Sequence, residues 1–150
     1  MSVLQGMKSK LLSDRGDKTF ILVFDKGDEV MAELLAFVRT EKIVSAHFNA
    51  LGAFSDVTFG FFERERQDYK RINVGQVEVM SLVGNVAATE DGEPKIHAHV
   101  IVGKLDGTAH GGHLFEGRVW PTLEMILIQT PESLLRKVDQ ETGLALIVIG

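Results

Sequence analysis

Alternating and continuous apolar runs along the chain predict a protein built mostly of β-strands. An apolar residue at every second position is typical of a strand with one buried face, whereas a short unbroken apolar run indicates a fully buried strand. The segments that fit one of these patterns, and that we expect to be strands, are 8–12, 19–24, 43–54, 57–64, 69–74, 76–88, 95–103, 108–115, 122–129 and 144–149. Clusters of turn-forming residues separate most of them.

One segment departs from the strand pattern. From Val30 onwards apolar residues recur every three to four positions, as on the buried side of an amphipathic helix. We predict a long helix over 29–41, with Asp28 capping the free N–H groups of its first turn. A second, short helix is expected over 131–140. The sequence therefore predicts an α+β fold with a mostly antiparallel sheet, one long helix and one short helix.

The chain has the length of one domain and contains no internal repeat, low-complexity segment or linker. We expect residues 1–7 to be a flexible lead-in and residues 8–149 to form a single domain. No apolar run reaches the roughly 20 residues needed to span a bilayer, so no membrane association is predicted. The N-terminus lacks the features of a signal peptide, and together with the absence of cysteine this favours a cytoplasmic protein.

The charge balance argues against one functional class. The chain has 16 Lys and Arg residues against 21 Asp and Glu residues, a formal net charge of −5. A domain that binds nucleic acid on its own gains affinity by neutralising phosphates and is normally basic. We therefore expect no strong autonomous DNA binding. The lack of cysteine also excludes disulfides, thiolate metal ligands and a cysteine nucleophile.

Four of the five histidines lie within one short stretch of the sequence. His97 and His99 are two residues apart on a predicted strand, so both side chains project from the same face, while Ala98 faces the core. The Asp106-Gly107 turn returns the chain as an antiparallel strand that carries His113. The alignment of His113 with the other two histidines depends on the register of this hairpin, which the sequence leaves open.

Three imidazoles on rigid strands, with one coordination position open, form the arrangement of a catalytic zinc site. We therefore predict a metal site made of His97, His99 and His113, which holds Zn²⁺ or another divalent transition metal. His110 has the opposite strand parity to His113 and is left out of the ligand set. The alternative is a polar histidine cluster at a subunit interface that holds no metal.

Four further residues are candidates for the walls of a pocket at this site. Gly111 and Gly112 precede His113 and, because they lack side chains, are expected to leave room for a ligand. His47 and Glu78 lie on other predicted strands, and Glu78 is also a candidate general acid or base. The alternative is a surface or satisfied core position for His47, and a surface or ion-paired carboxylate for Glu78. The sequence assigns no catalytic residue and no organic cofactor site.

Several segments together resemble one known family. They comprise 50–58, 78–86, 92–100, Asp106-Gly107 and 111–114. In combination they resemble the plant-and-prokaryote conserved (PPC) domain, also called DUF296, in its stand-alone prokaryotic form. The resemblance extends over about 8–149, nearly the whole chain.

The resemblance implies an antiparallel α+β fold and a homotrimer. Some prokaryotic relatives carry a metal on histidines that match His97, His99 and His113, and the fold is similar to that of acetolactate decarboxylase, a zinc enzyme with three histidine ligands. Plant members carry an AT-hook and are labelled DNA-binding. This chain has no Arg-Gly-Arg-Pro hook, so we expect any DNA binding to be weak or indirect.

Three hypotheses for the function follow. The first is a trimeric, metal-binding protein of the PPC type with a regulatory or binding role, for which an association with DNA through a partner is one form. The alternative is a small zinc-dependent lyase or hydrolase that uses the open metal position to polarise a carbonyl or activate water. A direct DNA-binding protein is the third hypothesis; only the family label supports it, and the charge balance opposes it. The apolar segments 123–128 and 144–149, with Trp120 and Pro121, are expected either at a subunit contact or in the core of the chain.

Overall fold

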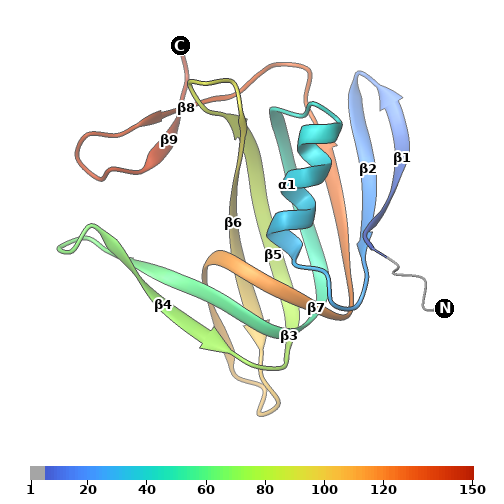
Figure 1. Cartoon of the computed structure of the whole chain (residues 1–150), viewed down its shortest axis with the longest axis vertical. Coiled ribbons are helices and arrows are strands. Elements are labelled where there is room, and N and C mark those ends of the chain that lie inside the picture. The colour runs from blue at the N-terminus through green and yellow to red at the C-terminus, as the bar shows by residue number, and fades with distance from the viewer. Residues whose placement is uncertain (1–5) are drawn as a thin grey trace.

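The computed structural model describes residues 6–150, which form one large sheet with a helix packed against it (Figure 1). The elements in chain order are β1 (Lys8–Arg15), β2 (Asp17–Phe24), α1 (Val30–Thr40), β3 (Ser45–Glu63), β4 (Asp68–Val74), β5 (Val77–Ala88), β6 (Pro94–Gly103), β7 (Ala109–Gln129), β8 (Leu135–Val138) and β9 (Ala145–Val148). The α+β class is confirmed. The helix matches the predicted segment to within a residue at each end, but at 11 residues, about three turns, it is short, so its description as a long helix is wrong.

The predicted flexible lead-in over 1–7 lies largely outside the described residues. Met7, immediately before β1, is partly buried and packs against the core. No helix in the described part of the chain is long and apolar enough to cross a membrane.

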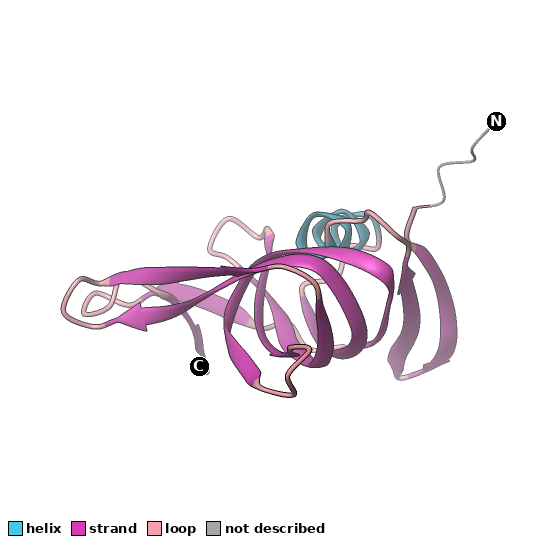
Figure 2. Ribbon diagram, turned by 90° about the horizontal axis from the view of Figure 1, so that it is seen from below, coloured by secondary structure: helices cyan, strands magenta, loops and turns pink. Residues whose placement is uncertain are grey.

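The strands are hydrogen-bonded in the order β1-β2-β7-β3-β5-β8-β9, while β4 pairs with β3, and β6 pairs with both β5 and β7. Strands β3, β5, β6 and β7 therefore form a closed circuit of antiparallel pairs. This circuit rolls the middle of the sheet, as the view in Figure 2 shows. Among the described strands only β5 and β8 pair in parallel, so the sheet is mixed but mostly antiparallel.

Two strands are much longer than the sequence pattern predicts. β3 joins the separate strands expected over 43–54 and 57–64, and β7 joins those expected over 108–115 and 122–129. Residues 55–56, which separate the two expected segments, do not end β3. The register with β7 shifts between Phe54 and Asp56, and the register with β5 shifts next to Gly52, so β3 continues through local irregularities. A Cβ on Gly52 would lie 2.2 Å from the carbonyl oxygen of Thr122, so this glycine permits close approach of β7.

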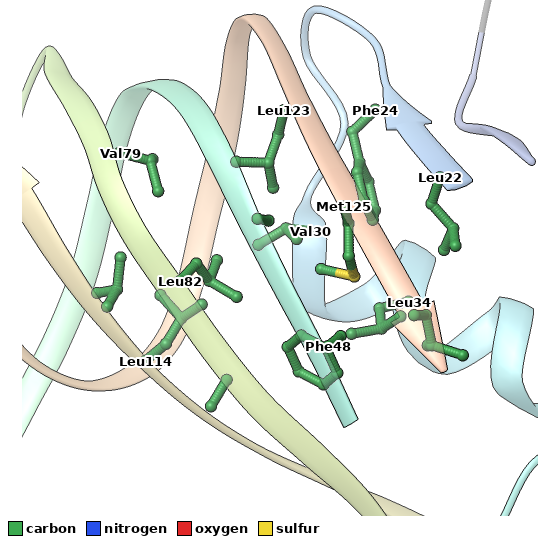
Figure 3. Packing of buried hydrophobic residues seen from close by; sticks show 14 of the residues in the cluster. Leu22, Phe24, Val30, Leu34, Phe48, Val79, Leu82, Leu114, Leu123 and Met125 are labelled. Atoms are coloured by element: carbon green, nitrogen blue, oxygen red, sulfur yellow. The ribbon is translucent and has the colours of Figure 1, made fainter. Parts of the chain in front are cut away.

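The core lies between α1 and the face of the sheet that the helix covers (Figure 3). The helix contributes Val30, Leu34, Phe37 and Val38, which are its buried residues. The sheet contributes alternate residues of its central strands, such as Leu22 and Phe24 of β2 or Leu123, Met125 and Leu127 of β7. Segment 123–128 therefore supplies core within the chain, whereas Leu146, Ile147 and Val148 of the other predicted contact segment are exposed.

The start of α1 differs from the prediction in its cap. Glu29 is the N-cap residue, and its carboxylate accepts hydrogen bonds from the backbone N–H groups of Met31 and Ala32. The same carboxylate accepts from the N–H of Gly117, which ties the helix to β7. Asp28, the predicted cap, accepts instead from the N–H of Asp25 and closes the preceding turn.

The prediction of a short helix over 131–140 is wrong. This segment contains strand β8, which pairs with β9 as a hairpin. Asp139 closes the turn of this hairpin by accepting from the N–H and the hydroxyl of Thr142. Pairing with β5 and β9 outweighs the weak helical pattern, because local propensity yields to tertiary contacts. In Figure 1 the β3–β4 and β8–β9 hairpins project from the same side of the sheet.

Candidate metal centre

Strand β6 places two histidines on the sheet face opposite the helix. Ala98 and Val100 are buried in the core, so the alternation of the strand directs His97 and His99 to the other face. The hairpin that follows sets the register that the sequence left open: His113 of β7 pairs directly with His99. All three imidazoles therefore project from neighbouring positions on one rigid surface.

The three side chains converge closely enough to share one ion. Each offers one ligand nitrogen, and these nitrogens all lie within 4.8 Å of one another. The Nε2 atoms of His97 and His99 are 3.1 Å apart. Two imidazole nitrogens on one tetrahedral zinc are about 3.3 Å apart, given zinc–nitrogen bonds of about 2.0–2.1 Å. The cluster therefore fits the spacing and the ligand chemistry of a zinc site or a similar metal site.

Burial and mutual repulsion favour the neutral, metal-binding form of these histidines. Burial, together with the nearby His97 and His99, lowers the pKa of His113 from its ordinary 6.5 to about 4. Burial, followed by the charges of His99, Arg136 and Lys95, also lowers the pKa of His97. Both imidazoles are consequently uncharged at neutral pH, and a neutral imidazole keeps the lone pair that a metal needs.

Tyr69 of β4 supports His113 from the side, a role that sequence reasoning missed. Its hydroxyl oxygen lies 3.5 Å from Nδ1 of His113, at the limit of hydrogen-bonding range, and the two rings are 4.7 Å apart. A phenol oxygen that accepts from Nδ1–H fixes the tautomer whose Nε2 lone pair is free. Burial raises the pKa of Tyr69, which keeps the phenol neutral.

The contact between Tyr69 and His113 crosses strand β3 at Gly60. Gly60 pairs with His113 on one side and with Arg71 on the other. A Cβ on Gly60 would lie 2.6 Å from the ring of Phe115, so the bare glycine lets the aromatic rings of β4 and β7 meet above it. A glycine inside an apolar run was the one available signal of this close approach.

The two glycines before His113 do not open space for a ligand. A Cβ on Gly111 would lie 2.4 Å from the carbonyl oxygen of Val100, and a Cβ on Gly112 would lie 2.4 Å from that of Gly60. Both glycines instead allow neighbouring backbones to pack tightly around β7. They help to hold His113 in register rather than line a pocket.

The other predicted pocket residues lie away from the histidine cluster. Glu78 lines a separate cavity with Trp120 and Pro121. His47 is exposed on β3 and pairs with Asn85, which in turn pairs with His97, so it is two strands from the cluster. His110 bonds to Thr108 near the hairpin turn and is not among the three grouped histidines, as its parity predicts.

A cavity of about 180 Å³ adjoins the cluster and is lined by residues of five strands. It is lined by Tyr69 of β4, Lys95 and His97 of β6, His113 of β7, Arg136 of β8 and the start of β9. Arg136 was missed because its segment was predicted as a short helix. It is buried, and it donates hydrogen bonds to the side-chain oxygen of Asn85 and to the carbonyl oxygen of Ala145.

Comparisons with known proteins place this geometry in a family. The family model of the Plants and Prokaryotes Conserved (PCC) domain matches residues 12–131. A plant- and prokaryote-conserved protein from Pyrococcus horikoshii is 32% identical, with a TM-score of 0.81 over 99% of this chain and 98% of its own. A metal-containing protein from Archaeoglobus fulgidus is 28% identical, with a TM-score of 0.80 over 97% and 100% of the two chains.

Another similar structure is described as a candidate DNA-binding protein, from Ralstonia eutropha. It is 32% identical to this chain, with a TM-score of 0.80 over 87% of this chain and 91% of its own. Acetolactate decarboxylase from Bacillus subtilis subspecies spizizenii is 16% identical, with a TM-score of 0.58 over 81% of this chain and 57% of that enzyme. At this identity the enzyme shows a similar fold alone, as the sequence resemblance implies.

The curated proteins contain no match to this sequence. The family assignment therefore rests on the family model and the solved structures. The model covers residues 12–131, well over half of the chain, and the same fold recurs in the Pyrococcus protein over almost its entire length. The chain belongs to the Plants and Prokaryotes Conserved (PCC) domain family.

Proposed function

We propose that the protein is a metal-binding member of its family, which holds Zn²⁺ or another divalent transition metal on His97, His99 and His113. The observation that carries the proposal is the convergence of three imidazole nitrogens within 4.8 Å. The similarity to a metal-containing protein from Archaeoglobus fulgidus supports it. The low pKa of His113 supports it further, because protons compete weakly for that ring.

The chain's own residues would prepare the site before any ion arrives. Strands β6 and β7 fix the positions of the imidazoles, so the side chains lose little conformational freedom when a metal binds. Tyr69 orients His113 from one side. A zinc ion held by three histidines keeps one position for an outside ligand and acts there as a Lewis acid.

Metal analysis of the purified protein tests the proposal directly. We expect about one zinc per chain after loading, and sub-micromolar binding by competition with a chromogenic chelator. His113→Ala should lower the affinity by a factor of about 100 or more, because only two ligands remain. His110→Ala is the matched control, since His110 lies on the same strand outside the cluster, and it should bind as the unaltered protein does. Equal binding by the two variants would contradict the proposal.

A second candidate function, a small metalloenzyme, is favoured by the cavity beside the histidines. A pocket of about 180 Å³ that includes His97 and His113 would give a small substrate access to a metal held by these histidines. We expect a zinc-loaded enzyme to hydrolyse an activated ester or decarboxylate a small keto acid, and His99→Ala to abolish that turnover. Rates that stay at the level of free zinc would leave only the binding role.

We also propose a homotrimer and an indirect association with DNA. Val83 and Ile101 are apolar and about half exposed beside His99, which supports a subunit contact on this face. Sedimentation equilibrium should give three times the chain mass, and a mass of one chain would remove the trimer. The net charge of −5 supports indirect DNA association. Salt-sensitive binding of the isolated protein to duplex DNA at physiological ionic strength would favour direct contact instead.

A further inference from the structure

The cavity beside the histidine cluster contains a buried positive charge with no negative partner. The side chain of Arg136 is only 5% exposed, and none of the ion pairs among the described residues includes it. Its hydrogen bonds go to two neutral acceptors, the amide oxygen of Asn85 and the carbonyl oxygen of Ala145. Its Nε is buried and has no hydrogen-bond partner among the residues that the structure describes. A buried cation in this state is costly unless an anion neutralises it.

The rest of the cavity strengthens the preference for an anion. Lys95 is a second cation on its wall and also takes part in none of the ion pairs among residues 6–150. Tyr69 adds a neutral hydroxyl that can donate a hydrogen bond. Within the described part of the chain, no carboxylate lines this cavity, so no carboxylate there competes with an incoming anion for these groups.

Asn85, on strand β5 next to the histidine cluster, sets the position of Arg136. Asn85 of β5 pairs directly with His97 of β6, and its side chain accepts from Arg136. The guanidinium group is therefore anchored next to His97 while part of its donor set remains unused. A fork of guanidinium N–H groups suits a flat, two-oxygen anion, which can accept two parallel hydrogen bonds.

The size and the apolar wall of the cavity favour an organic anion over an inorganic one. A volume of about 180 Å³ corresponds to roughly six water molecules at their liquid volume. Ile96, Leu144 and Leu146 give one side of the cavity an apolar surface that would suit a short carbon chain. Phosphate would satisfy the cations but would leave this apolar surface without a partner.

We propose that this cavity binds the carboxylate group of a small organic acid through Arg136 and Lys95. The proposal rests on the proposed function in one respect: the acid would lie beside a metal held by His97 and His113. A small carboxylic acid would then be the ligand or substrate class of that metal. The anion site itself requires only the chain's own side chains.

A titration with propionate tests this proposal. Binding is monitored through the side-chain and backbone resonances of the protein in nuclear magnetic resonance spectra. We expect saturable shifts at His97, His113 and Arg136 in both metal-free and zinc-loaded protein. The neutral isostere propionamide should give none. Equal shifts with propionamide would overturn the proposal, and so would inorganic phosphate that binds about tenfold more tightly than propionate at the same residues.

Variants separate the charge from the fold. Arg136→Gln should weaken propionate binding about tenfold or more, whereas Arg136→Lys, which keeps the charge but loses the fork, should weaken it less. Lys95→Met removes an exposed cation and tests the site even where Arg136→Gln fails to fold; we expect about threefold weaker binding. Lys137→Met is the matched control, because Lys137 is exposed next to Arg136 and outside the cavity. Unchanged binding in both Arg136→Gln and Lys95→Met would overturn the proposal.

Failure of this proposal and failure of the metal site are distinguishable. Zinc stoichiometry is measured separately on each variant by metal analysis. Zinc binding without propionate shifts would overturn the carboxylate site and leave the metal site standing. Propionate shifts that depend on Arg136 in a protein that binds no zinc would support the carboxylate site and remove the metal.

Discussion

His99 and His113 pair directly across neighbouring strands β6 and β7, yet they differ in their surroundings. His99 is exposed, whereas His113 is half-buried against the rings of Tyr69 and Phe115. The ring centroids of the two histidines are 5.6 Å apart. His99 is therefore free to act only as a ligand, whereas His113 also contributes to the packing of the sheet.

This contrast predicts different effects of two substitutions. His99→Ala should leave the melting temperature of the metal-free protein nearly unchanged, because an exposed ring contributes little packing. His113→Ala should lower the free energy of unfolding of the metal-free protein by about 1–2 kcal/mol through lost contacts with Tyr69 and Phe115. Both should abolish most of the stabilisation that added zinc gives the unaltered chain, which differential scanning fluorimetry measures. Zinc stabilisation that persists in His99→Ala would contradict its place in the cluster.

The pH dependence of stability should carry the signature of His113. Burial, with the neighbouring imidazoles, lowers its pKa to about 4 in the folded chain, whereas an unfolded chain titrates it near 6.5. Between these values the unfolded state binds more protons, so the metal-free protein should lose stability as the pH falls from about 6.5 towards about 4. Urea denaturation at several pH values checks this dependence.

His113→Asn is the comparison for this pH effect. The variant lacks the titrating ring, so its urea midpoint should fall less steeply over the same pH interval. His97 adds a contribution of the same sign in both proteins, because its pKa is also lowered. A ring of His113 that titrates near 6.5 in nuclear magnetic resonance spectra of the folded, metal-free protein would contradict the expectation.

Glu29 should be important for stability out of proportion to its size. Its carboxylate accepts from the N–H groups of Met31, Ala32 and Gly117 at once. Glu29→Ala should lower the free energy of unfolding by about 1–2 kcal/mol, since it exposes the helix start and removes a tie to β7. Glu90→Ala, at an exposed loop position, is the control and should change the stability by less than about 0.5 kcal/mol. Urea denaturation measures both, and similar midpoints for the two variants would refute the capping role.

Gly112 should tolerate no side chain. A Cβ at this position would lie 2.4 Å from the carbonyl oxygen of Gly60, so strands β3 and β7 would have to move apart. Gly112→Ala should lower the free energy of unfolding by about 1–3 kcal/mol and weaken zinc binding, because His113 is the next residue. Gly75→Ala, where no atom lies within 4 Å of the added carbon, should leave both unchanged or raise stability slightly. A Gly112→Ala protein as stable as Gly75→Ala would show that the strands can adjust.

The sequence determined the parts of this protein that depend on local periodicity. Alternation on a strand was enough to predict that His97 and His99 share one face and that Ala98 is buried. The spacing of apolar residues predicted helix α1 to within a residue at each end. The Asp106-Gly107 turn predicted the hairpin that returns His113 towards them. Each of these features is fixed by residues close together in the chain.

Only the tertiary structure decided the features that join distant segments. Three such features join strands that the local pattern does not relate. His113 pairs opposite His99, Tyr69 approaches His113 over Gly60, and Arg136 is buried beside Asn85. The break residues of β3 became local irregularities within the strand, and the segment expected as a second helix became β8, because strand pairing supplied contacts that outweigh local preference. A periodic pattern shows which face of an element is buried, but the pairing of elements decides which side chains meet.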